Sequence, residues 1–143
     1  TEGFRTLREQ LTSAWVEGAR GRAALDAMGI AYIRFAIDNP SHYRVMFGGF
    51  VDPEAHESEL ATEAAGSFQA LVDALAALQA KGEARADDTL HLAQFVWAVV
   101  HGVAMLVIDG RLHAAGDVEQ LMRFAIARLG TGIDAPGPRA EPT

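Results

Sequence analysis

The segment QFVWAVVHGVAMLVIDG, residues 94–110, constrains the fold more than any other part of the chain. From Gln94 to Ile108 its only ionisable side chain is His101. So apolar a segment is either a membrane span or a helix buried on most of its sides. The uncharged run from Phe95 to Ile108 is shorter than the roughly 20 residues that cross a bilayer, and no basic residue flanks its N-terminal side. The sequence therefore favours a buried helix.

Composition bounds the rest of the chain. Its 143 residues, half of them hydrophobic, match the size of one domain with a real core. A net charge of −7 argues against direct contact with nucleic acid, because binding phosphates needs clustered Lys and Arg. The absence of cysteine excludes a disulfide framework, a thiolate nucleophile and a cysteine zinc site, and it suits a cytoplasmic protein. The chain opens at Thr1 in what reads as the interior of a helix, so we expect an upstream portion to precede it.

Apolar spacing and turn residues predict an all-α fold, a bundle of about six helices joined by short loops. The expected helices cover residues 2–17, 22–38, a short stretch from Pro40 to the Gly48-Gly49 pair, Pro53 or Glu57 to Lys81, 88–109, and 117–129. Asn39, Asp117 and either Asp87 or Asp88 are typical N-caps, and Gly82 and Gly110 are typical helix ends. We expect one domain over residues 1–130 and a flexible Gly/Pro-rich tail over residues 131–143.

The expected helix at 88–109 is apolar around nearly its whole circumference. Plotted at about 100° per residue, it separates three faces. The first carries Gln94, Trp97, His101, Met105 and Ile108; the second Leu92, Val96, Val99, Val103 and Val107; and the third Phe95, Gly102 and Leu106. So small a domain needs something to cover the outer side of this helix. A second copy of the chain is the simplest cover.

His101 admits three interpretations. Trp97 one turn away and Met105 beside it are typical of a pocket that holds a mostly apolar ligand by one hydrogen bond. A core histidine bonded to a neighbouring carbonyl or carboxylate is the second interpretation. Ligation of haem or a metal is the least favoured, because metal sites need several ligands at set spacings and the other histidines are isolated. No nucleophile elbow or phosphate loop occurs, so we expect no catalytic residue, no metal and no cofactor.

A set of aromatic residues supplies further wall candidates: Tyr32, Phe35, Tyr43, Phe47, Phe50 and Phe68. At helical spacing such residues are more often core than binding site. Some of them are nonetheless expected to line any cavity that His101 faces. We expect Phe68, Tyr43 and Phe47 opposite His101.

Two stretches together resemble a known family. AYIRFAIDNPSHYRVMFGG, residues 31–49, and VWAVVHGVAMLVIDGRL, residues 96–112, are similar to the C-terminal effector domain of TetR-family transcriptional regulators. The branch in question is labelled by a Trp-His-Gly motif, which here is Trp97, His101 and Gly102. The resemblance spans nearly the whole chain. It implies a two-part repressor, in which an N-terminal helix-turn-helix binds operator DNA as a dimer and this domain binds a small molecule. No helix-turn-helix is present in the sequence, so DNA binding belongs to an upstream part.

The resemblance also implies where the sites lie. A pocket among the second to fifth helices would take a small apolar or aromatic effector, with ligand-binding residues Met28, Tyr32, Tyr43, Phe47, Phe68, Trp97, His101 and Met105. The last two helices would pair two chains into a homodimer through Val96, Val99, Gly102, Val103, Leu106, Leu121, Phe124, Ala125 and Arg128. Two other functions stay open: a helical dimerisation module without a ligand, and a small haem-binding or ligand-binding protein that uses His101.

Overall fold

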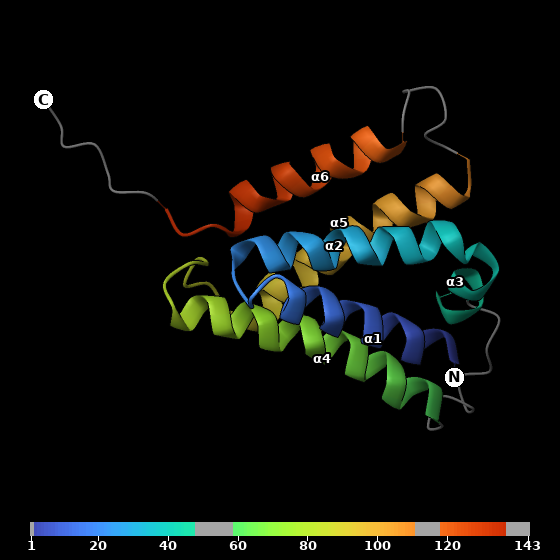
Figure 1. Cartoon of the computed structure of the whole chain (residues 1–143), viewed down its shortest axis with the longest axis horizontal. Helices are drawn as coiled ribbons and strands as arrows, with labels where there is room; N and C mark the ends of the chain where they lie inside the picture. The colour runs from blue at the N-terminus through green and yellow to red at the C-terminus, as the bar shows by residue number, and fades with distance from the viewer. Residues whose placement is uncertain (1, 48–58, 111–117, 137–143) are drawn as a thin grey trace, which may run out of the picture.

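The computed structural model describes residues 2–47, 59–110 and 118–136, and within these ranges all the regular elements are helices (Figure 1). They are α1 (Glu2–Glu17), α2 (Arg22–Asp38), α3 (Pro40–Phe47), α4 (Glu59–Ala80), α5 (Thr89–Ile108) and α6 (Val118–Ile133). The predicted all-α bundle is confirmed. The expected helix start at Pro53 or Glu57, the Asp117 cap and Phe50 lie outside the described residues, as does the end of the predicted tail, residues 137–143.

Helix α2 lies at the centre of the bundle and packs against each of the other described helices. In Figure 1, α1 and α4 run side by side below it and α6 runs along the opposite edge. The sequence of α2 explains this position, because apolar residues surround it. Leu25, Met28, Tyr32 and Phe35 are buried on one side, and Ile33 on another.

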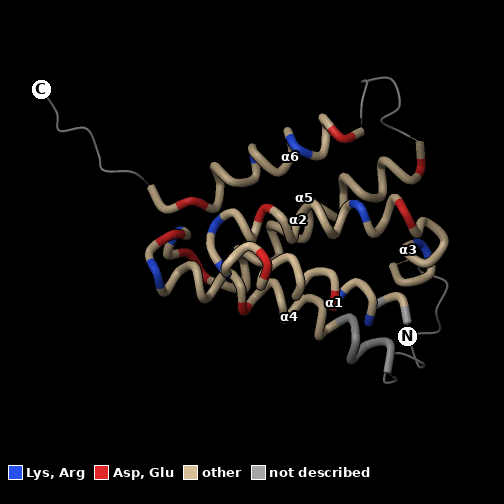
Figure 2. The backbone as a smooth tube through the Cα atoms, in the orientation of Figure 1, with Lys and Arg blue, Asp and Glu red and all other residues tan. Residues whose placement is uncertain are grey.

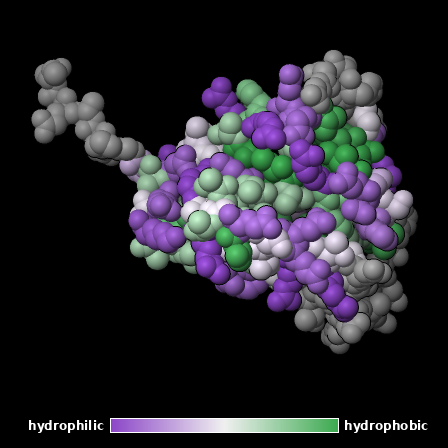
Figure 3. Space-filling view, viewed as in Figure 1, coloured by the Kyte–Doolittle hydropathy of each residue, from purple (hydrophilic) through white to green (hydrophobic). Residues whose placement is uncertain are grey.

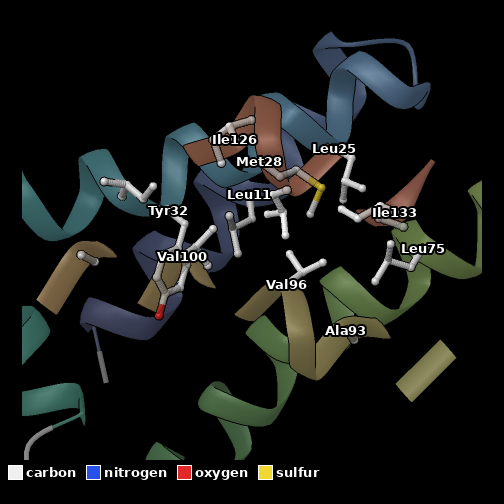
Figure 4. Packing of buried hydrophobic residues seen from close by; sticks show 14 of the residues in the cluster. Leu11, Leu25, Met28, Tyr32, Leu75, Ala93, Val96, Val100, Ile126 and Ile133 are labelled. Atoms are coloured by element: carbon white, nitrogen blue, oxygen red, sulfur yellow. The ribbon is translucent and has the colours of Figure 1, made fainter. Parts of the chain in front are cut away.

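The core forms where side chains from α1, α2, α4, α5 and α6 converge (Figure 4). Leu7, Leu75 and Met122 are among its fully buried members. Helix α5 approaches this core through the small residues Ala93 and Ala104, which let its backbone lie close to its neighbours. Burying a large aliphatic side chain stabilises a fold by about 1.5–3 kcal/mol, so this shared core is the main stabilising force.

Three contacts hold α6 and the residue that follows it against α2. A Cβ built on Gly29 would lie 2.6 Å from Ile126 Cδ1, so the two helices touch closely at mid-length. Arg34 donates to both carboxylate oxygens of Glu119 at 2.6 and 2.7 Å near one end. Arg22 pairs with Asp134 at the other end. Figure 2 shows where the charged residues of α2 and α6 lie along the two helices.

The end of α6 lies beyond the position predicted for it. We expected the last helix to stop near Leu129, but it continues to Ile133 and includes Gly130. Two contacts explain the extension. The Arg22 guanidinium occupies the space where a side chain at position 130 would stand, and Ile133 is 1% exposed. The Arg85 N–H then donates to the Ile133 carbonyl at 2.8 Å, which holds the helix end against the chain after α4.

Capping residues define the ends of α5 much as the sequence predicts. The Asp88 carboxylate accepts a hydrogen bond from the His91 N–H at 2.9 Å, an N-cap interaction. At the other end Gly110 has a φ of +70°, a conformation that glycine adopts without strain. Arg44 of α3 donates to the Ile108 carbonyl at 2.7 Å, so the end of α5 is also tied to α3.

The turn between α1 and α2 leaves no room for a side chain at Gly18. A Cβ there would lie 2.5 Å from Ala24 Cβ and 2.6 Å from Ala24 Cα. The next two residues, Ala19 and Arg20, both have positive φ values, 59° and 55°. The turn is therefore tight because α2 starts directly against the end of α1.

We expect Gly18→Ala to lower the free energy of unfolding by about 1–3 kcal/mol, because the added methyl group overlaps the Ala24 backbone. The matched control is Gly66→Ala on α4, where the nearest atom is Nη1 of exposed Arg8 at 3.1 Å and can move aside. That control should gain stability, by up to about 1 kcal/mol, from helix propensity. Urea unfolding followed by circular dichroism measures both. Equal effects of the two substitutions would contradict this account of the turn.

Candidate functional site

A cavity of about 390 Å³ lies between α1, α2, α4 and α5, next to the end of α3. Its volume is in the range that holds small molecules. The wall is formed by Leu7, Leu11, Leu25, Met28, Gly29, Tyr32, Met46, Phe47, Ser67, Phe68, Leu71, Gln94, Val96, Trp97 and Val100. None of these described wall residues carries a charge. In Figure 4 the labelled wall residues Leu11, Met28 and Val96 point toward one another across the centre of the bundle.

One end of the cavity is aromatic. The ring centroid of Trp97 lies 6.1 Å from that of Phe68 and 6.2 Å from that of Phe47. Trp97 is 39% exposed and Gln94 is exposed as well, so this end opens toward solvent. Flat rings on three sides favour a planar, apolar guest.

Behind the aromatic end, four polar atoms from α2, α3 and α5 form a hydrogen-bonded cluster. The Trp97 Nε1–H donates to Tyr32 Oη at 3.1 Å. Tyr32 Oη lies 2.8 Å from Tyr43 Oη and 3.3 Å from His101 Nδ1. Tyr43 Oη lies 2.5 Å from the same Nδ1 atom. These four residues are called the tyrosine–histidine cluster below.

The protons of the cluster can be assigned by requiring that each one has an acceptor. If His101 Nδ1 accepts from Tyr43 and Tyr43 accepts from Tyr32, every hydroxyl proton is paired. If Nδ1 carried a proton, one hydroxyl would have no acceptor in the cluster. Burial lowers the pKa of His101, which agrees with an uncharged ring. Burial also raises the pKa of Tyr32 to about 12 and raises the pKa of Tyr43, so both phenols stay protonated.

The structure brings together most of the residues predicted for a ligand site, with a different role for some. Met28, Tyr32, Phe47, Phe68 and Trp97 line the cavity. The remaining three, Tyr43, His101 and Met105, are not part of the wall. We expected His101 to face the cavity, and this detail was wrong. The reason is that the Tyr32 and Tyr43 hydroxyls already engage its Nδ1 atom.

Helix α1 and the far end of α2 contribute wall residues that were not predicted from the sequence. Leu7 and Leu11 of α1 line the cavity, as does Leu25 of α2. The spacing of four residues between Leu7 and Leu11 marks a buried helix face, which is the only signal that the sequence offers. Their position opposite α5 is a long-range property of the bundle, and helix periodicity alone does not contain it.

The outer face of α5 and α6 is apolar and uncovered. Phe95 and Leu106 of α5 are exposed, and Phe124 of α6 is 59% exposed. A Cβ built on Gly102 would meet no atom within 4 Å. Figure 3 shows hydrophobic residues gathered over α5 and the neighbouring edge of α6. The Arg128 guanidinium lies 5.2 Å from the centroid of the Phe124 ring.

The residues predicted for a dimer interface divide between this outer face and the core. Gly102, Leu106, Phe124 and Arg128 belong to the outer face, whereas Val99, Val103, Leu121 and Ala125 are half-buried. Val96 was assigned to the wrong side, since it is 4% exposed and lines the cavity. Its position on α5 is turned toward α2 and α4. Phe95 belongs to the outer face but was not among the predicted interface residues.

Metal ligands do not gather in the described part of the chain. Within residues 2–47, 59–110 and 118–136, no group of three or more His, Asp or Glu side chains is placed to hold a metal ion. His101 is surrounded by the rings of Tyr43, Phe47 and Trp97 at centroid distances of 5.6, 4.9 and 5.5 Å. The geometry therefore offers recognition by shape and hydrogen bonding.

The chain is similar to known regulatory domains. The family model for the "Tetracyclin repressor-like, C-terminal domain" matches residues 25–129. The structure of a protein with unknown function from Rhodococcus sp. RHA1 superposes with a TM-score of 0.84 at 26% sequence identity, over 93% of this chain and 68% of that one. The crystal structure of SCO4313, described as a candidate regulatory protein, has a TM-score of 0.67 at 24% identity, over 90% and 68%. No curated protein sequence matches the chain.

We expect His101→Phe to lower the free energy of unfolding by about 1–3 kcal/mol, because one buried hydroxyl proton loses its acceptor. His101→Asn places an amide oxygen near the position of Nδ1 and should be the more stable variant, although its side chain is smaller. Urea titration of both variants measures the difference. An Asn variant less stable than the Phe variant would show that packing, and not the acceptor, is what position 101 supplies.

Wild type and His101→Asn should also differ in how their free energy of unfolding depends on pH. Burial lowers the pKa of His101, so the folded state binds this proton less readily than the unfolded state does. The stability that neutral His101 contributes is therefore fully present at a pH above the ordinary pKa of histidine. It is lost as the pH falls below that pKa. Relative to His101→Asn, which does not titrate, wild type should lose stability between about pH 7 and pH 5. If the free energy of unfolding of the two proteins changed equally with pH over this range, the prediction would be contradicted.

Proposed function

The chain belongs to the family of tetracyclin repressor-like C-terminal domains, and on that premise we propose that it is the effector-binding and dimerisation domain of a TetR-type transcriptional repressor. The observation that carries the proposal is the apolar cavity of about 390 Å³ inside a fully helical bundle. A small domain that leaves such a volume between four helices forgoes packing contacts. A ligand that fills the volume restores those contacts.

The wall supports an apolar or aromatic effector. Leucine, methionine and valine side chains form most of it, and Phe47, Phe68 and Trp97 close one end. No group of His, Asp or Glu side chains that could hold a metal occurs in the described part of the chain. This composition of the wall supports a domain that acts by binding a small molecule.

Signalling from the cavity passes through α1. Leu7 and Leu11 of this helix form part of the wall, and they also pack in the core against α2. A ligand that binds better to one placement of α1 shifts the population of dimers whose DNA-binding domains match the operator spacing. A coupling of about 1–3 kcal/mol changes operator affinity by about 5- to 150-fold. Operator DNA is bound by an N-terminal domain upstream of this chain, in the cytoplasm.

Dimerisation accounts for the uncovered face of α5 and α6. Only 28% of the most apolar stretch of α5 is buried within the chain. This helix is long and apolar enough to cross a membrane, as the core helices of soluble proteins also can be. Its contacts with α2, α4 and α6 favour pairing with a second copy, in which Gly102 lets two backbones approach closely.

We expect a screen of apolar and aromatic compounds to give ligands that raise the melting temperature and change tryptophan fluorescence. At one hundred times its Kd, a ligand stabilises the fold by about 2.7 kcal/mol, or roughly 5–10 °C. Leu71→Trp fills the cavity and should abolish binding. Ala76→Trp adds the same side chain on the exposed face of α4 and should leave binding unchanged. Absence of any ligand for wild type would favour the dimerisation module without a ligand.

Light scattering at micromolar concentration should give about twice the chain mass of 15.3 kDa. Gly102→Leu should shift the mass toward one chain without changing helix content, because its side chain has open space within its own fold. The matched control Ala76→Leu lies on the exposed face of α4, away from the outer face, and should remain dimeric. A wild-type monomer would overturn the dimer proposal.

A further inference from the structure

The tyrosine–histidine cluster meets the cavity at two of its members. Tyr32 and Trp97 both line the wall, and the hydrogen bond between them joins two lining residues. Trp97 is a donor only, since an indole N–H has no lone pair to offer. Gln94 at the mouth is exposed and offers both a donor and an acceptor, so it does not discriminate between ligands. The polar side chains of the inner wall are therefore Tyr32, Trp97 and the buried Ser67.

Tyr32 Oη already has three polar neighbours. With the ring carbon to which the oxygen is bonded, they make four atoms around it. They are Trp97 Nε1 at 3.1 Å, Tyr43 Oη at 2.8 Å and His101 Nδ1 at 3.3 Å. A ligand joins this set only by replacing one of them, and the longest contact is the one to His101. In the paired arrangement the Tyr32 proton goes to Tyr43 and the Tyr43 proton goes to Nδ1, so the contact between Tyr32 Oη and Nδ1 carries no proton. A ligand acceptor that takes this place therefore draws the Tyr32 proton away from Tyr43.

Charge restricts the ligand further. The described cavity wall holds no Lys, Arg or protonatable histidine that would balance a carboxylate or phosphate. An ionised group moved into such a site loses its hydration without gaining a partner. A neutral carbonyl oxygen accepts a hydrogen bond without that cost.

We propose that the cavity selects an uncharged, apolar ligand with one carbonyl oxygen, a ketone, ester or lactone, which accepts a hydrogen bond from Tyr32 Oη. This inference rests on the proposed ligand-binding function and names the chemistry of the ligand. Once the Tyr32 proton points to the ligand, the Tyr43 proton turns to Tyr32 Oη. His101 Nδ1 then donates to Tyr43 Oη. The ring stays neutral, because the proton on Nε2 leaves to solvent as another arrives on Nδ1, and His101 is half-buried with access to water.

Matched probes test the proposal on the intact chain. They are 2-acetylnaphthalene, 2-isopropenylnaphthalene, which replaces the carbonyl oxygen with a methylene group, and the carboxylate 2-naphthoate. Calorimetry gives the ratio of ketone affinity to alkene affinity. In Tyr32→Phe this ratio should fall by about 2- to 10-fold relative to wild type, since one buried hydrogen bond is lost. In Tyr43→Phe it should stay the same or rise, because Tyr32 loses its best internal acceptor. Thermal melts check that both variants fold.

Nitrogen-15 NMR of the histidine ring supplies a second readout. Nδ1 of His101 should show the shift of an unprotonated nitrogen in the free protein and in the alkene complex, and that of a protonated nitrogen in the ketone complex. An unprotonated Nδ1 in the ketone complex, an unchanged ratio in Tyr32→Phe, or 2-naphthoate binding as tightly as the ketone would each overturn the proposal while leaving the ligand cavity in place. Failure of all three probes to bind would overturn both the proposal and the proposed function.

Discussion

The apolar circumference of α5 is the constraint on which the rest of the structure depends. A helix with His101 as its only ionisable side chain between residues 92 and 108 has to be covered on every side. The chain covers it with α2, α4 and α6 and leaves one strip uncovered. The cavity, the outer face and the tyrosine–histidine cluster all lie on this one helix, at different angles around its axis. The cavity wall and the uncovered apolar face therefore both draw on the same 20 residues.

The cluster shows how a polar group is accommodated in such surroundings. Tyr43 is 0% exposed and its hydroxyl has no access to water, so it needs a partner within the fold. His101 provides one from α5, and Tyr32 provides another from α2. Three helices are thereby held in register by hydrogen bonds that apolar packing alone does not specify. The Trp-His-Gly motif has a physical meaning here. Its first two residues complete this cluster, and Gly102 leaves open space on a different face of the helix.

Helix periodicity accounts for what the sequence predicted well and for where it failed. The N-cap at Asp88 follows from a local signal and was predicted correctly. Asn39 was predicted to cap the helix that follows it, but its side-chain amide donates to the Phe35 carbonyl at 3.0 Å and caps the C-terminus of α2. The assignment of Val96 failed because the second predicted face of α5 is divided, with Val96 turned inward and Val99 half-buried. Rotation of a helix about its axis depends on every neighbour at once. The part of α1 in the cavity wall was missed for the same reason, since contacts between distant segments leave no periodic trace.

The unfilled cavity also bears on how long the protein lasts in a cell. Side chains around an open volume lack neighbours on one side, so the empty fold holds less stability in reserve than the occupied one. Occupancy raises the free energy of unfolding by mass action, and the fraction of chains open to proteases falls accordingly. Under the proposed ligand-binding function, the domain is therefore degraded faster wherever its ligand becomes scarce. The amount of the protein in the cell, and not only its conformation, then depends on the concentration of the small molecule.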